Sequence, residues 1–150
     1  MDQFPIVRLA LSEWINQTPD LILCGIAPNE AKALTAATQL KPDVVVTEIL
    51  DQQDFESIRS LHQRFPQLPI LVFSFRDEGW YAPRALEAGA DGYLMKGVSV
   101  EVLLNGIRET LEGRVVLSSE MRARLLMKCL RRRRNLKRLS NHRCDCSLFE

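Results

Sequence analysis

An apolar run begins at Val44 and extends to Leu50, with Thr47 and Glu48 as its polar members. Most of its residues are β-branched, and no polar residue alternates with the apolar ones before Thr47. Such a run is typical of a strand that is covered on both faces in the middle of a parallel sheet. Glu48 then falls at the carboxyl end of the strand, where open α/β sheets bind ligands, although a plain solvent-exposed cap is the alternative.

The remaining pattern alternates short apolar runs with segments of helical period. Apolar residues between Pro5 and Gln17 recur at helical spacing and predict a first helix. Asn29, Asp54 and Ser99 are candidate N-caps of later helices. The pattern predicts strands at 21–27, 43–49, 70–73 and 93–95, and further helices at 29–40, 54–65, 80–88 and 99–112. This alternation predicts an α/β fold with a doubly wound parallel sheet.

Three polar residues follow three of the predicted strands. Glu48, Ser74 and Lys96 each lie at the carboxyl end of a strand, and in a doubly wound sheet these ends converge on one pocket. An acid, a hydroxyl and an ammonium together suit the binding of an anion or a phosphoryl group, with the lysine as a point charge. A structural Glu–Lys ion pair without chemistry is the alternative interpretation.

Composition indicates an ordinary globular chain. The chain has 150 residues, of which 46% are hydrophobic, enough for one domain with a real core. Its apolar runs are all shorter than the ~20 residues that span a bilayer, and the N-terminus lacks the pattern of a signal peptide, so we expect a cytoplasmic protein without membrane contact. The four cysteines, which form no spaced disulfide framework, are Cys24, Cys129, Cys144 and Cys146.

The charge is divided between an acidic body and a basic tail. Residues 1–113 carry 9 Lys and Arg against 16 Asp and Glu, a net charge of −7, whereas residues 114–150 carry 11 against 3, a net charge of +8. Ser118 or Ser119 is the expected cap of a helix in this tail. The basic cluster comprises Arg131, Arg132, Arg133, Arg134, Lys137 and Arg138. It suits nonspecific binding of nucleic acid through phosphates, while a solvated charged linker is the more ordinary interpretation.

His142, Cys144 and Cys146 lie close together near the C-terminus and are potential metal ligands. The spacing His-x-Cys-x-Cys lacks the paired two-residue gaps of zinc ribbons, and a fourth ligand is not evident. We therefore expect no metal site in the tail.

The segment Ala85–Lys96, which ends in Gly-Ala-Asp-Gly-Tyr-Leu-Met-Lys, resembles the end of a response-regulator receiver domain of the LuxR/FixJ type. Two further segments match sequence patterns of that family, namely Lys41-Pro42-Asp43 and Phe65-Pro66. The resemblance implies a flavodoxin/CheY-like receiver over residues 2–117, followed by a basic helical linker or tail over 118–150. It further implies a non-enzymatic signalling protein that acts in transcription regulation through protein contacts.

The resemblance assigns roles to single positions. Glu48 stands where the family has its phosphoacceptor Asp, Ser74 at the switch hydroxyl, and Lys96 at the lysine that pairs with the phosphoryl group. Tyr93 matches the aromatic residue that turns inward on activation. Asp2 and Gln3 fall at the acidic pair that holds Mg²⁺. The implied partners are a histidine kinase, another regulator or a second copy of the chain.

Departures from the family pattern change what we expect of this site. Glu48 is one methylene longer than Asp, and phosphoryl transfer requires accurate in-line placement, so we expect no phosphorylation there. Glu48 instead offers a standing negative charge toward Ser74 and Lys96. With Gln3 in place of an acid, Asp2 and Glu48 make a poor Mg²⁺ site, and we expect no cofactor.

The family's first strand, which precedes the acidic pair, is missing from this sequence. Without it, strands 21–27 and 43–49 would each expose unpaired backbone groups inside the protein. Either the two strands pair directly, another chain supplies the strand, or the true start lies upstream, which we expect. At the other end, a faint helix-turn-helix opening stops before any recognition helix, so we expect DNA binding only nonspecifically or in a longer product.

A small anion-binding or hydrolytic α/β enzyme that uses Glu48 and Lys96 is an alternative function. The sequence offers no activated nucleophile, glycine-rich phosphate loop or histidine base in support of it. A nonspecific nucleic-acid-binding protein that uses residues 131–138 is the other alternative. The leading hypothesis remains a degenerate receiver whose state is set by Glu48 instead of by phosphorylation.

Overall fold

The computed structural model describes residues 1–141, and the side chains of residues 1–131. The chain divides into two compact units, Met1–Leu117 and Ser118–Glu150. The helices are α1 (Pro5–Asn16), α2 (Glu30–Leu40), α3 (Gln52–Arg64), α4 (Glu78–Ala88), α5 (Val100–Leu111) and α6 (Ser119–Asn141), and the strands are β1 (Val45–Thr47), β2 (Ile70–Ser74) and β3 (Gly92–Met95). None of the helices in the described part of the chain is long and apolar enough to cross a membrane.

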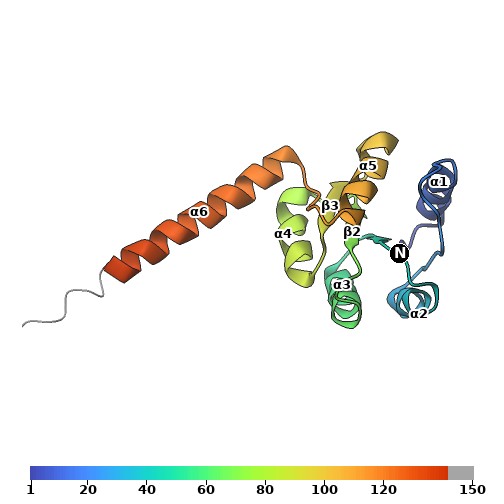
Figure 1. Ribbon diagram of the computed structural model, residues 1–150, viewed down its shortest axis with the longest axis horizontal. Helices are drawn as coiled ribbons and strands as arrows, with labels where there is room; N and C mark the ends of the chain where they lie inside the picture. The colour runs from blue at the N-terminus through green and yellow to red at the C-terminus, as the bar shows by residue number, and fades with distance from the viewer. Residues whose placement is uncertain (142–150) are drawn as a thin grey trace, which may run out of the picture. The chain divides into compact units, whose positions relative to one another are not determined.

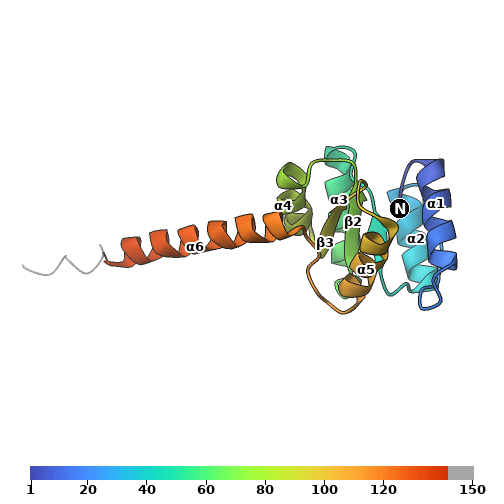
Figure 2. The same ribbon diagram turned by 90° about the horizontal axis from the view of Figure 1, so that it is seen from above.

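The first unit is built on a parallel sheet of three strands in the order β1-β2-β3. Figures 1 and 2 show this sheet between two layers, with α1 and α5 on one side and α2 and α3 on the other. Every residue of β2 is buried, as expected for the central strand of a covered parallel sheet. The predicted α/β class with a parallel sheet is therefore confirmed.

The core joins the sheet to α5. Leu71 and Phe73 of β2 pack with Leu94 of β3, and Leu103 and Ile107 of α5 complete this cluster of buried side chains. Because β2 lies between β1 and β3, and both β2 and β3 pack against α5, the carboxyl ends of these two strands are fixed in place. The residues that follow them, which include Lys96, are therefore presented from a rigid support.

Helix starts follow local capping rules, with one correction. Asn29 caps α2 by accepting from the backbone N–H of Lys32, and Ser99 caps α5 in the same way. The predicted cap of α3 at Asp54 is wrong. Asp51 is the N-cap, and Asp54 accepts from the Asp51 backbone N–H to complete a capping box, so the helix begins at Gln52.

The predicted strand at 21–27 is not formed. This segment has no regular secondary structure, and Ile22 and Ile26 are 89% and 52% exposed. A strand exists only where a neighbour accepts its hydrogen bonds. Here the neighbouring position is occupied only by Met1 and Asp2, whose Asp2 N–H donates to the Ala27 carbonyl at 3.4 Å.

β1 is also shorter than the predicted 43–49. It pairs with β2 on one side, but on the other side it meets only Met1, whose carbonyl accepts from the Glu48 N–H at 3.0 Å. Val45 and Val46 are accordingly half-buried instead of fully buried. The expectation that both faces and both edges of this run are covered therefore holds only at its carboxyl end, where Thr47, Glu48 and Ile49 are buried.

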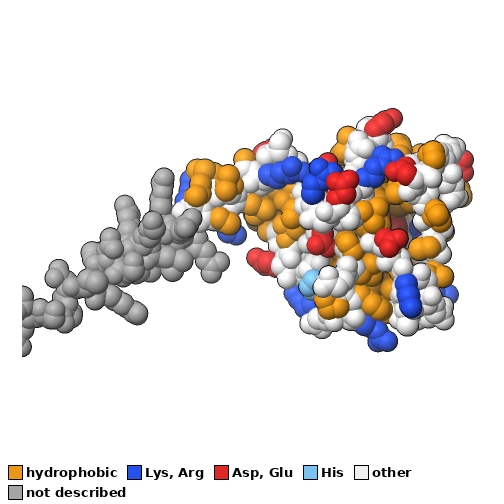
Figure 3. All heavy atoms as spheres, in the orientation of Figure 1, with side chains coloured by type: hydrophobic (Ala, Val, Ile, Leu, Met, Phe, Trp, Pro, Cys, Tyr) orange, Lys and Arg blue, Asp and Glu red, His pale blue; other side chains and the backbone are white. Residues whose placement is uncertain are grey.

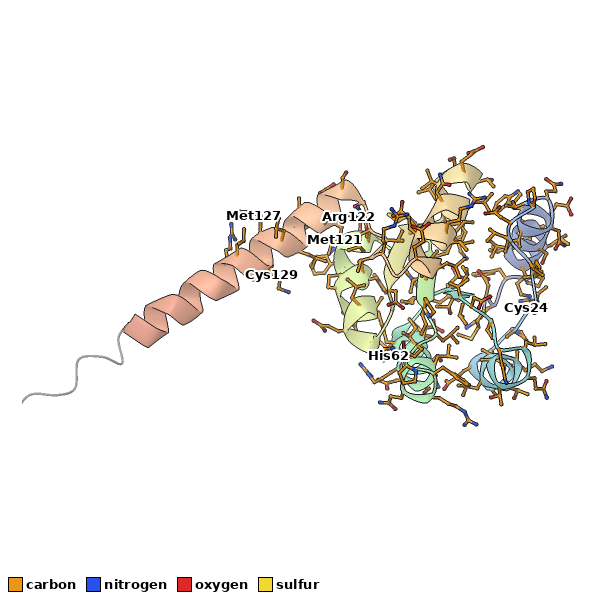
Figure 4. The ribbon with its side chains drawn as sticks, viewed as in Figure 1. Cys24, His62, Met121, Arg122, Met127 and Cys129 are labelled. Atoms are coloured by element: carbon orange, nitrogen blue, oxygen red, sulfur yellow. The ribbon has the colours of Figure 1, made fainter. Side chains whose placement is uncertain are left out.

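Gly89 ends α4 in a left-handed conformation with φ of 110°, and it passes close to α3. A Cβ atom at this position would lie 2.4 Å from Cγ of His62. Figure 4 shows His62 on α3, where its side chain packs against Gly89. Glycine is required here for both conformation and space.

We expect Gly89→Ala to lower the free energy of unfolding by about 1 kcal/mol or more, since the substitution adds conformational strain to a steric clash. Denaturant unfolding of the purified chain measures this. Gly97→Ala is the control, because no atom lies within 4 Å of its added Cβ and its φ is not positive. Equal stability of the two variants would contradict the assignment.

Candidate functional site

The Lys96 ammonium forms the centre of a buried charge cluster at the carboxyl end of the sheet. Its Nζ lies 2.7 Å from Oδ2 of Asp2 and 2.7 Å from Oε1 of Glu48. The three side chains are only 2%, 5% and 3% exposed. Asp2 precedes α1, Glu48 follows β1 and Lys96 follows β3, so the cluster joins segments that are far apart in the sequence.

Aromatic rings surround the same ammonium. The rings of Phe4, Phe73 and Phe75 have their centroids 5.7, 5.9 and 5.2 Å from Lys96 Nζ. At such distances a cation is attracted to the negative face of a ring, and the attraction is stronger when water is excluded. The lysine is thus held by carboxylates and rings together, and the described residues leave little of it for a further ligand.

Glu48 is buried, with 4% of its surface exposed. Neither oxygen of its carboxylate has a hydrogen bond of ordinary geometry within the described residues, although Oε1 is in ion-pair contact with Lys96. Burial is the main cause that raises the pKa of Glu48, and the nearby Asp2 charge adds to it, while Lys96 opposes the shift. This carboxylate therefore depends on one ammonium for its charged form.

Asp2 is better supplied with partners than Glu48. Its Oδ1 accepts from the Phe4 backbone N–H at 2.7 Å, and its carbonyl accepts from the Arg8 guanidinium at 2.7 Å. These contacts place Asp2 at the start of α1 and aim its second oxygen at Lys96. The structure thus brings together Asp2, Glu48 and Lys96 of the residues selected from the sequence.

Ser74 and Tyr93 lie beside the cluster but make other contacts. The Ser74 hydroxyl donates to the Ile49 carbonyl at 2.7 Å and accepts from the Arg76 N–H at 3.1 Å. The Tyr93 hydroxyl donates to the Arg76 carbonyl at 2.9 Å, and burial raises the pKa of Tyr93 to about 12. Both side chains are fully buried and fix the loop after β2.

Sequence reasoning missed the three phenylalanines and Arg76. The Arg76 guanidinium donates to the Leu50 carbonyl at 2.6 Å, so this residue connects the loops that follow β1 and β2. Phe73 and Phe75 flank Ser74 in the sequence, and Phe4 follows Asp2 closely. Their positions in the sequence next to the candidate site residues were the signal that could have indicated them.

A Mg²⁺ ion does not fit the donors that are present. The two nearby carboxylates, Asp2 and Glu48, both contact Lys96 at 2.7 Å, and Gln3 is exposed and neutral. A divalent cation would have to displace the ammonium from both acids. Across residues 1–131 no group of three or more His, Cys, Asp or Glu could hold a metal ion.

The remaining candidates lie on the second unit. α6 is a continuous helix through the basic cluster, but of that cluster only the side chain of Arg131, which is exposed, belongs to the described residues. The contacts of Arg132–Arg138 remain a prediction. His142, Cys144 and Cys146, the weak metal candidates, lie outside the described residues.

Comparison with known proteins gives consistent matches. Residues 1–108 match the sequence profile of a family described as the response regulator receiver domain. The chain is 27% identical over 123 residues to response regulator protein VraR of Staphylococcus epidermidis, which covers 81% of this chain and 59% of that protein. VraR of Staphylococcus aureus gives the same identity and coverage. The chain therefore spans about 59% of the length of these curated relatives.

Solved structures show the same fold. A LuxR-family two-component response regulator from Aurantimonas matches with a TM-score of 0.76 and 26% identity, over 86% of this chain and 94% of that one. The response regulator domain of Thermotoga maritima CheB matches with a TM-score of 0.66 and 24% identity, over 74% and 92% of the two chains, which supports the fold alone. The expected flavodoxin/CheY-like architecture is confirmed.

We expect Lys96→Met to lower the free energy of unfolding by about 3–5 kcal/mol, because it leaves two buried carboxylates without their cation. The matched control is Arg108→Met on α5, which breaks the ion pair between Arg108 and Asp20. The two side chains are 37% and 55% exposed, respectively. The loss of this ion pair is expected to change the free energy of unfolding little, because water screens an exposed ion pair. Denaturant unfolding of both variants tests the contrast, and similar losses would contradict the buried arrangement.

We expect Glu48→Gln to change how stability depends on pH. The pKa of Glu48 is raised above its ordinary 4.5 in the folded chain. Between the unfolded and folded values the folded chain keeps a proton that the unfolded chain has lost, so the free energy of unfolding falls as pH rises through that interval. The Glu48→Gln variant has no carboxyl proton at this position, so its free energy of unfolding does not fall in this pH interval.

Urea unfolding of the wild type and the variant, from about pH 4 to about pH 8, measures the two slopes. Glu87→Gln, on the exposed surface of α4, is the control and is expected to keep the wild-type slope. If the Glu48→Gln variant also kept the wild-type slope, the proton that causes the slope would belong to another group.

Proposed function

Since this chain belongs to the family of response regulator receiver domains, which serve two-component signalling, we propose that it works as a receiver without being phosphorylated. One observation carries the proposal. Glu48 stands at the phosphoacceptor position and already lies 2.7 Å from Lys96, the lysine that matches the family's phosphoryl-binding residue. The signal would then be carried by a fixed charge instead of a transferred group.

The surroundings of Glu48 argue against phosphoryl transfer. An acyl phosphate forms only if a carboxylate oxygen can attack in line, with a metal ion to neutralise the developing charge. The Glu48 carboxylate is buried and paired, and a Mg²⁺ ion does not fit beside it. An incoming phosphodonor would meet neither a free nucleophile nor a metal.

The same surroundings suit a standing charge. Glu48 places a carboxylate against Lys96, where a phosphoryl group would lie in a member of the family with Asp. Tyr93 is fully buried, which is the inward position that the resemblance associates with activation. We therefore propose that Glu48 holds the domain in one signalling state.

Output through protein contact completes the proposal. Relatives of this chain are response regulators, and one solved neighbour is a LuxR-family regulator. We propose a role in transcription regulation through a protein partner, such as a histidine kinase, another regulator or a second copy. DNA binding would require a further domain or the basic cluster at 131–138.

We expect no phosphoryl group on this chain after incubation with acetyl phosphate and Mg²⁺. The measurement is intact mass, taken at neutral pH before the acyl phosphate can hydrolyse. A receiver that keeps Asp at this position, treated in the same tube, shows that the donor is competent.

The Glu48→Gln variant identifies the acceptor if a mass gain is seen. A gain in the wild type that disappears in Glu48→Gln would overturn the proposal. A gain that persists in the variant would exclude Glu48 as the acceptor, but it would place a phosphoryl group on another residue and so contradict the expected absence of phosphorylation.

A further inference from the structure

A cavity of about 200 Å³ lies beside Glu48, at the carboxyl end of β1. Its walls include the loop that follows β1, the first turn of α3 and the start of α2. Five of its lining residues are acidic, and none of the described ones is a lysine or an arginine: the acids are Asp2, Glu30, Glu48, Asp51 and Asp54. On the face that Figure 3 shows, by contrast, acidic and basic side chains of the first unit are interspersed. The cavity is therefore a local concentration of negative charge.

The excess of negative charge persists when the nearby positive groups are counted. Lys96 contacts Glu48, and the Met1 amine lies at the edge of the same cavity. Helices α2 and α3 begin there, and the N-terminus of a helix counts as about half a positive charge. Together these groups offset about three of the five carboxylate charges. The cavity therefore attracts a cation and repels an anion.

Glu48 adds an observation that points to a ligand. Its side chain is 3% exposed, and Oε1 contacts Lys96, whereas Oε2 has no hydrogen-bond donor within the described residues. A buried carboxylate oxygen without a donor is unfavourable, because it has lost water and gained no partner. Glu48 lines the cavity, and the last torsion angle of a glutamate rotates easily. A donor bound in the cavity is thus a suitable partner for this oxygen.

Two further carboxylates are held in place through one oxygen each. Oε2 of Glu30 accepts from the Ser57 hydroxyl at 2.9 Å. Oδ2 of Asp54 accepts from the backbone N–H groups of Leu50 and Asp51 at 2.7 and 3.0 Å. The second oxygen of each carboxylate remains as an acceptor for a ligand. Acceptors that are already fixed lose little freedom on binding, which favours affinity.

The arrangement of these acids favours a broad cation over a metal ion. Within residues 1–131 no group of three or more His, Cys, Asp or Glu could hold a metal ion, so the acids of the cavity do not converge on one point. An ammonium carries its three donors on a single atom. A guanidinium is planar, carries five N–H donors spread over a wider fork and is more weakly hydrated. It can donate to carboxylates that one metal ion cannot reach together.

We propose that this cavity binds a guanidinium group, which donates to Glu48, Glu30 and Asp54. The group belongs either to a small guanidinium compound or to an arginine side chain, and the recognition chemistry is the same for both. This inference rests on the proposed function, because it takes Glu48 as an unphosphorylated carboxylate. Binding places a cation against the fixed charge and so gives the domain a way to respond to a ligand.

Ethylguanidinium is the probe, and ethylammonium and Mg²⁺ are the comparison cations at matched ionic strength. Amide chemical shifts of the full chain are followed by NMR. Ethylguanidinium is expected to give saturable shifts at Leu50 and Asp51, and to bind about tenfold more tightly than ethylammonium, the difference made by one hydrogen bond to a charged group. Equal affinities of the two organic cations, saturation by Mg²⁺ alone, or no saturable shift would overturn the proposal.

Two variants that lose the same charge locate the binding. Glu30→Gln is expected to weaken ethylguanidinium binding about tenfold. Glu56→Gln, on the exposed surface of α3 and outside the cavity lining, is expected to change it little. Binding that Glu30→Gln leaves unchanged would overturn the location. If Glu30→Gln does not fold, Glu48→Gln replaces it, with the same expected loss.

Two further arms identify the source of the guanidinium group. Tighter binding of the peptide acetyl-Gly-Arg-Gly-amide than of ethylguanidinium would assign the cavity to an arginine of a polypeptide, and weaker binding would assign it to a small compound. In the second arm, Arg131, Arg132, Arg133 and Arg134 are changed to glutamine. Tighter binding of ethylguanidinium by this variant would show that the chain's own basic cluster competes for the cavity. Each of these outcomes supports the proposal and names the source.

Failure of this inference is distinguishable from failure of the proposed function. A phosphoryl group on Glu48 after incubation with acetyl phosphate would overturn both. A chain that stays unphosphorylated and gives no saturable shift with ethylguanidinium would overturn the guanidinium site alone.

Discussion

The first unit depends on the ion pairs that the Lys96 ammonium forms with Asp2 and Glu48. The ammonium neutralises one of the two carboxylates that share its space, and the aromatic rings around it keep water away. Charges removed from water are stable only when their partners are well placed. Each of the three segments that supply these groups is therefore constrained by the other two, and the end of the sheet behaves as one electrostatic unit.

The open edge of β1 and the charge cluster share Met1 and Asp2. Met1 bonds to Val46 at the edge of β1, while Asp2 bonds to Lys96 in the cluster. Two adjacent residues thus contact both features. The edge of β1 and the buried charge cluster are thus connected by one peptide bond.

The sequence was most informative where structure is set locally. The apolar run of β2 and the caps at Asn29 and Ser99 were predictable because burial and capping follow from neighbouring residues. The convergence of Glu48 and Lys96 followed from the rule that parallel strand ends meet. Asp51 was missed as a cap because Asp54 offers the same chemistry three residues later.

Non-local features were harder to predict. The segment 21–27 has the composition of a strand, but its partner is missing, and a strand is a property of the pair. The rings around Lys96 and the turn of Ser74 toward Ile49 depend on loop paths that no periodicity encodes. The site residues could thus be named from the sequence, while their partners required the structure.

The bond between Lys96 and Asp2 joins residues 94 positions apart. Contacts of such separation form late, since the chain between them must be ordered before the ends can meet. A ribosome-bound chain has no complete cluster until β3 has emerged and found the N-terminus. The buried charge cluster is therefore complete only in molecules in which β3 has reached the N-terminal segment.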